Sequence, residues 1–126
     1  MPGKTLFSII ESSGHPNFTA LYNELDVQET KINSMRKAIA ALKTQQPNFI
    51  VAEFFYGYGN NYAGVNISNL DVLLYSLQKY STLTKVIVLV DKHEYQHVDK
   101  LNTIIKLHDV FKLPVSKEQI KKSLAK

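Results

Sequence analysis

Apolar positions in this chain gather into short segments that are typical of buried strands. The two clearest are residues 49–55 and 86–90, which are nearly continuous apolar runs. Such runs are expected where helices cover both faces of a sheet. Residues 6–10 and 109–112 are shorter segments of the same kind, and residues 27–32 alternate weakly between apolar and polar positions. The pattern therefore predicts five strands.

Stretches with helical spacing of apolar residues separate these strands. Pro47 ends the second stretch, because the residue before a proline is disfavoured in a helix, and residues 116–119 form a capping box at the start of the last one. Strands that alternate with helices predict an α/β fold with a doubly wound, five-stranded parallel sheet, and 126 residues suffice for one domain, residues 1–126. The helices are predicted over residues 17–25, 34–45, 70–77, 95–105 and 116–124.

One carboxylate, Glu53, lies near the end of the central apolar run, and Glu11 follows the first strand in the same way. Open α/β sheets bind their ligands at the carboxyl ends of the strands. Glu53 is therefore a candidate functional residue. The alternative interpretation is a glutamate that meets water where its strand ends.

Residues 54–64 combine five aromatic side chains with three glycines and predict an irregular loop. Aromatic side chains supply contact area at low entropy cost, which favours a surface for a ligand or a partner. The alternative is a loop that folds over the domain through its own side chains. The candidate contact residues are Phe55, Tyr56, Tyr58, Asn60, Asn61 and Tyr62.

Composition narrows the function classes. The 15 basic residues exceed the 11 acidic ones by four, a mild excess that concentrates in the last helix, so nucleic acid is not the expected partner. No apolar run approaches the roughly 20 residues that cross a bilayer, so no membrane span is expected. The chain has no cysteine, which fits the cytoplasm.

Residues 93–97 match the H-E-x-x-H pattern, in which two histidines bind zinc and the glutamate acts as a base. A catalytic zinc needs a third protein ligand, and only His108 or Glu118 follow as loose candidates. A zinc hydrolase that uses His93 and His97 is therefore a weak alternative, and solvent-exposed histidines are the main expectation.

Three passages resemble a response-regulator receiver (CheY-like) domain: residues 47–53 its third strand, 85–90 its fourth strand, and 109–116 its fifth strand and the approach to its last helix. The resemblance implies a flavodoxin-like, three-layer α/β/α sandwich. The family has an acidic pair after the first strand, a phosphoryl-accepting aspartate on the third, a hydroxyl residue after the fourth, and a lysine before a proline after the fifth. In this sequence those positions hold Glu11 and Ser12, Glu53, Val90 and Leu113.

Each departure from that pattern weakens phosphoryl transfer, which needs an aligned nucleophile, a metal ion and groups that take up phosphoryl charge. Glu53 is one methylene longer than aspartate and displaces the attacking oxygen by about 1.5 Å, and a misplacement of about 1 Å can cost about 100-fold in rate. Ser12 removes one acid, Val90 offers no hydrogen bond, and Leu113 removes a cation.

The resemblance and its departures together indicate a pseudo-receiver: a non-catalytic signalling domain of the two-component type, bacterial by resemblance, that acts through contacts with a protein partner and needs no cofactor. A homodimer through the last two helices and the fifth strand is a further expectation. The alternative is a small-molecule-binding module that uses Glu53 and the tyrosine-rich loop. For the pseudo-receiver, the carboxylate of Glu53 is predicted to accept hydrogen bonds from backbone amides or tyrosine hydroxyls of residues 54–62.

Overall fold

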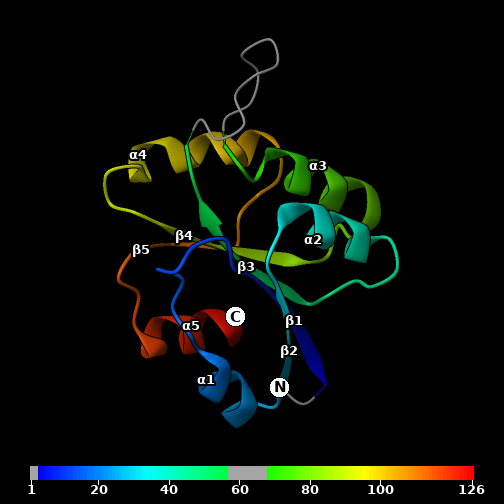
Figure 1. Ribbon diagram of the computed structural model, residues 1–126, viewed down its shortest axis with the longest axis vertical. Helices are drawn as coiled ribbons and strands as arrows, with labels where there is room; N and C mark the ends of the chain where they lie inside the picture. The colour runs from blue at the N-terminus through cyan, green and yellow to red at the C-terminus, as the bar shows by residue number, and fades with distance from the viewer. Residues whose placement is uncertain (1–2, 57–67) are drawn as a thin grey trace.

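The computed structural model describes residues 3–56 and 68–126 (Figure 1). Five parallel strands form one sheet in the order β2-β1-β3-β4-β5, which confirms the doubly wound topology predicted from the sequence. The weakly alternating segment 27–32 is an edge strand, where one side of the backbone needs no partner strand. The strands are β1 (Lys4–Ile9), β2 (Val27–Ile32), β3 (Phe49–Phe54), β4 (Lys85–Val90) and β5 (Asp109–Lys112).

Helices cover both faces of this sheet, as Figure 1 shows. One apolar cluster joins the sheet to α2, α3, α4 and the 3-10 turn, and a second joins it to α1 and α5. None of the helices within the described residues is long and apolar enough to cross a membrane. The helical elements are α1 (Thr19–Glu24), α2 (Met35–Leu42), α3 (Asp71–Tyr80), α4 (Tyr95–Val98), a 3-10 turn (Asp99–Thr103) and α5 (Lys117–Leu124).

Strand β3 lies at the centre of the sheet, and all six of its residues are buried. Side chains alternate between the two faces of a strand. Ile50, Ala52 and Phe54 therefore pack in the cluster under α2 and α3, while Phe49 and Val51 pack in the cluster with α1 and α5. Glu53 follows the second set and so emerges at the carboxyl end of β3, on the face that α1 and α5 cover.

The predicted helix over residues 95–105 is wrong in form. One turn of α-helix, α4, passes directly into the 3-10 turn. The buried residues are Val98, Leu101 and Ile104, whereas Tyr95 is exposed. A spacing of three residues puts side chains in line on a 3-10 helix, which has three residues per turn, so the apolar pattern fits the tighter geometry.

Candidate functional site

Glu53 is buried at the carboxyl edge of the sheet, with 3 % of its surface exposed. Its Oε1 atom accepts hydrogen bonds from the backbone amides of Glu11 (3.1 Å) and Ser12 (3.2 Å). Its Oε2 atom accepts a short bond of 2.6 Å from the hydroxyl of Ser12. Nδ1 of His15 lies 3.4 Å from Oε1, and both side chains are 4 % exposed. The groups that contact the carboxylate all come from the segment between β1 and α1.

This segment, residues 10–18, is held in place by its own hydrogen bonds. The amide of Ile10 continues the ladder by donating to the carbonyl of Ile32 at 2.7 Å. The chain then turns: the amide of His15 donates to the carbonyl of Ser12, and the amide of Gly14 donates to the Ser12 hydroxyl oxygen. The hydroxyl of Ser12 thus accepts one bond within the turn and donates another to Glu53.

The two carboxyl groups of the site differ in their electrostatics. Burial alone would raise the pKa of Glu53, but the His15 imidazole 3.4 Å away and the hydrogen bonds from Ser12 and the Glu11 amide hold that pKa below its ordinary value. Burial raises the pKa of the Glu11 carboxyl, a hydrogen bond from Asn69 opposes the rise, and the charge of Glu53 adds to it. Glu53 is therefore the stabilised anion of the pair.

Asn69 connects the site to the segment after β3. Its Nδ2 atom donates to Oε1 of Glu11 (2.7 Å) and to the carbonyl of Glu53 (2.8 Å), and its Oδ1 atom accepts from the amide of Phe55 (2.7 Å). Sequence reasoning missed this residue. Its only local signal was the capping pattern at residues 68–71, where Oδ1 of Asp71 accepts from the amide and the hydroxyl of Ser68 and α3 begins at Asp71.

The five positions carried over from the receiver pattern fall into two groups. Glu11, Ser12 and Glu53 come together in the hydrogen-bonded site. Val90 and Leu113 lie at the ends of β4 and β5, where the Leu113 amide donates to the Val90 carbonyl at 2.8 Å. These two side chains are apolar and give no charge or hydrogen bond to the carboxylate.

Within residues 3–56 and 68–126, the donors to Glu53 differ from the predicted ones, and the part of the prediction that concerns residues 57–62 lies outside the described residues. Sequence reasoning assigned them to residues 54–62, but the observed donors are the amide of Glu11 and the amide and hydroxyl of Ser12, while Nδ1 of His15 lies 3.4 Å from Oε1. Residues 11 and 12 follow β1 at the carboxyl edge of the sheet, next to the end of β3, and the Glu53 side chain reaches them there. Among the candidate loop residues, Tyr58, Asn60, Asn61 and Tyr62 lie outside the described residues.

Tyr56 is described, and it contacts the residues that matched the zinc pattern. Its ring stacks on His97 with 3.6 Å between centroids and 11° between planes, and its amide donates to Oε1 of Glu94 at 3.2 Å. His93 lies before α4 and contacts Asp91 at 2.8 Å. Within the described ranges, no group of three or more histidine or acidic residues could hold a metal ion. Glu94 and His97 instead hold Tyr56, two residues beyond the end of β3.

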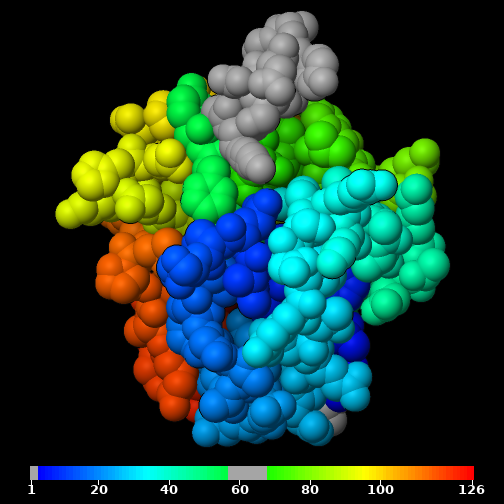
Figure 2. Space-filling view, viewed as in Figure 1, coloured from blue at the N-terminus to red at the C-terminus, as the bar shows by residue number. Residues whose placement is uncertain are grey.

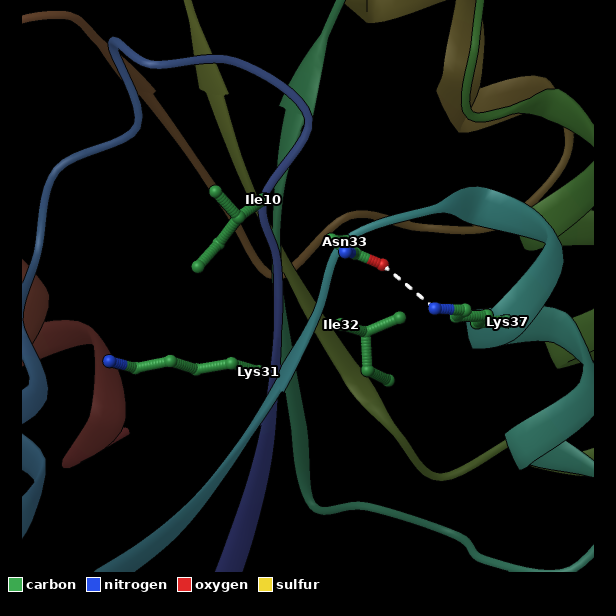
Figure 3. A pocket seen from close by; sticks show the side chains of 5 residues that line it. All are labelled: Ile10, Lys31, Ile32, Asn33 and Lys37. Carbon is green, nitrogen blue, oxygen red and sulfur yellow. Dashed lines mark hydrogen bonds between the residues drawn. The ribbon is translucent and has the colours of Figure 1, made fainter.

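Two open hollows flank the ends of β1 and β2. One of about 380 Å³ is lined by Ile10, Lys31, Ile32, Asn33 and Lys37. Figure 3 shows Lys37 donating to Asn33 (3.3 Å), while Lys31 extends to the other side of the strand. A second hollow of about 230 Å³ shares Ile10 and Lys31 and reaches Ser12 and His15. In the space-filling view, the first third of the chain, in blue and cyan, occupies the middle and lower part of the visible face (Figure 2).

The arrangement of the sheet and helices is similar to that of solved receiver domains. One is the receiver domain of a sensor histidine kinase from Pseudomonas aeruginosa PAO1, with a TM-score of 0.70 and 10 % identity over 97 % of this chain and 94 % of the other. The chain has the receiver fold. Another structure with this fold is the signal receiver domain of a protein described as a Luxo repressor from Vibrio parahaemolyticus, with a TM-score of 0.73 and 16 % identity over 99 % and 88 % of the chains.

The fold of this chain is also similar to that of a pilus assembly protein, CpaE, from Caulobacter crescentus. The TM-score is 0.65, with 16 % identity over 98 % of this chain and 92 % of the other. No protein-family model matches the sequence, and no curated protein matches it. The likeness is therefore one of fold, and the function has to be argued from this chain's own residues.

Proposed function

We propose that this chain is a receiver-like signalling domain that is not phosphorylated in the usual way and acts through contacts with a protein partner. The observation that carries the proposal is the state of Glu53, whose carboxylate is buried and accepts three hydrogen bonds from residues 11–12 of the same chain. A nucleophilic carboxylate must present an oxygen to the phosphoryl donor. Here the segment between β1 and α1 covers both oxygens.

The surroundings of Glu53 support the same conclusion. The Pseudomonas receiver domain was solved with a magnesium ion in its active-site cleft. In this chain the second acid is replaced by Ser12, whose hydroxyl bonds to Glu53 itself, and His15 brings an imidazole to 3.4 Å from the carboxylate. Lys112, the lysine next to the Leu113 position, does not supply a charge to Glu53: its Nζ atom lies 4.9 Å from the ring centroid of Tyr95, on the surface. The groups that transfer and stabilise a phosphoryl group are thus replaced by groups that hold a fixed anion.

The partner surface that we propose is formed by α4, β5 and α5. Lys112, Lys117 and Lys121 are exposed there and could pair with acids of a partner or of a second copy. Tyr95 adds an aromatic side chain that is 44 % exposed. We propose that residues 1–126 form one such domain and that it acts in the cytoplasm.

A phosphorylation assay tests the proposal directly. The purified chain is incubated with acetyl phosphate and magnesium beside an active receiver domain as the positive control, and both are analysed by intact-mass spectrometry. We expect a phosphoryl adduct on the control and none on this chain. An adduct that maps to Glu53 would refute the proposal.

A second candidate function is small-molecule binding at the carboxyl edge of the sheet. The hollow of about 380 Å³ beside Lys31 and Lys37 favours it, because ligand sites commonly have volumes of about 300–1,000 Å³. A ligand of the folded state raises the melting temperature. A thermal-shift screen of small anions, repeated with Lys37→Ala, would separate binding at this hollow from a general salt effect.

A further inference from the structure

The amino edge of the sheet, opposite Glu53, carries a groove of about 440 Å³. The turn before β4 forms one wall of the groove, and the segment before β5 forms the other. Its lining combines one protruding apolar residue, Leu83, with Lys85, Lys106, His108 and Lys126. This groove lies at the opposite edge of the sheet from Glu53, and His108 and Lys126 place it beside the start of β5 and the end of α5.

The turn that carries Leu83 is fixed by buried hydrogen bonds. The hydroxyl groups of Ser81 and Thr84 lie 2.5 Å apart, and the Thr84 hydroxyl donates to the carbonyl of Pro47 at 2.6 Å. Both side chains are buried, whereas Leu83 between them is 91 % exposed. The turn therefore presents a leucine to solvent on a rigid backbone. A preorganised apolar side chain loses little conformational entropy when a partner covers it.

The charged groups of the groove are mainly cationic. Nζ of Lys85 donates to the carbonyl of Lys126 (2.6 Å), and Nζ of Lys126 pairs with Asp109 (3.0 Å). Asp109 thus offsets one of the three lysines. Within the described part of the chain, Lys106 forms no ion pair. The groove keeps an excess of positive charge beside Leu83.

We propose that this groove, with Leu83 at its rim, is a docking surface for an acidic partner protein that has an apolar hollow for the leucine. Exposed leucines are common, but this one is held on a turn with buried hydrogen bonds, beside Lys106, which forms no ion pair among the described residues. Carboxylates of the partner would face Lys106 and Lys85, which sets the orientation of the complex. A second copy that docks through the same groove fits poorly, because Lys85 and Lys106 of the two grooves would face each other.

The experiment begins with a photo-crosslinking amino acid placed at Leu83 in the full chain, in the cells that make the protein. The matched control places it at Val72, another exposed apolar residue, on α3. The protein captured only from position 83 is identified, purified and titrated with the unlabelled chain. Leu83→Ser and Lys106→Glu are then compared with Val72→Ser and Lys92→Glu, which alter exposed residues outside the groove.

We expect an acidic partner whose binding weakens about 10-fold or more with Leu83→Ser and with Lys106→Glu, and stays unchanged in both controls. An acid-to-lysine change in the partner should restore binding to Lys106→Glu. Glu53→Gln should bind like the parent, which separates this surface from the proposal on phosphorylation. Capture of a second copy or of nucleic acid, no adduct specific to position 83, or a partner indifferent to both groove variants would overturn the inference.

Discussion

Replacing Glu53 by alanine should destabilise the chain far more than replacing it by glutamine. The alanine variant leaves three donors without their acceptor: the amides of Glu11 and Ser12 and the Ser12 hydroxyl. Each stranded buried donor costs about 1–3 kcal/mol. Because residues 11–15 can relax toward water, part of this cost is recovered, and we expect a net loss of about 2–4 kcal/mol.

Glutamine keeps one acceptor oxygen in the same place. It can still accept from the two backbone amides, and its amide group can donate to the Ser12 hydroxyl, which accepts equally well. The loss is then mainly that of charge-assisted bonds and of the contact with His15, about 1 kcal/mol. Glu24→Ala, at an exposed position on α1, is the matched control and should change stability by less than about 0.5 kcal/mol.

Urea unfolding followed by circular dichroism gives these free energies, and hydrogen exchange of the Ser12 amide reports on the segment itself. We expect faster exchange at Ser12 in Glu53→Ala and near-parental exchange in Glu53→Gln. If the alanine variant unfolds within about 0.5 kcal/mol of the parent, or if glutamine costs as much as alanine, the hydrogen-bonded carboxylate does not hold the segment and the reasoning fails.

Three further predictions concern the same site. Ser12→Ala removes the 2.6 Å bond and should cost about 1–2 kcal/mol in urea unfolding, whereas Ser13→Ala, at an exposed neighbour, should be neutral. The lowered pKa of Glu53 means that its stabilising contribution, present above the ordinary value of 4.5, is lost as pH falls through its folded-state pKa. The raised pKa of Glu11 acts in the opposite direction, so the free energy of unfolding should rise as pH falls toward 4.5. Below that pH it should decline, because Glu53 becomes protonated. A Glu53→Gln variant whose stability declines as steeply below pH 4.5 would contradict the assignment of this decline to Glu53. Asn69→Ala should cost about 1–3 kcal/mol in thermal unfolding because it leaves a backbone amide and the Glu11 carboxyl without a partner, and an unchanged melting temperature would exclude this role.

The fold was predictable because its signals are local. The continuous apolar runs of β3 and β4 require cover on both faces, and Ser116 with Gln119 forms the capping box that the sequence predicted. The 3-10 turn after α4 was missed, although Val98, Leu101 and Ile104, in and beside the turn, repeat at a spacing of three. An amphipathic pattern over so few residues fits both helix types, and packing against the sheet decides between them.

The site was only partly predictable because its contacts are long-range. Glu53 was identified from its place at the end of β3, but its donors lie more than 40 residues earlier in the chain. Parallel strands bring the segment after β1 and the end of β3 to the same edge, since β1 and β3 are neighbours in the sheet. The topology therefore predicts that the two segments approach each other, whereas the direction of each side chain depends on the turn at residues 12–15 and on Asn69.

The extra methylene of Glu53 has two consequences that support each other. In a phosphoryl-accepting site it would move the attacking oxygen out of line, which is a loss. Here the same length places Oε2 2.6 Å from the Ser12 hydroxyl and Oε1 within reach of two amides of the segment that crosses the edge of the sheet. A carboxylate so bonded has a lowered pKa and is a poorer nucleophile than a free one. The length that would misplace the attacking oxygen in transfer is thus also the length that lets Glu53 bond to residues 11 and 12, and this supports the proposal that the domain acts through its surfaces.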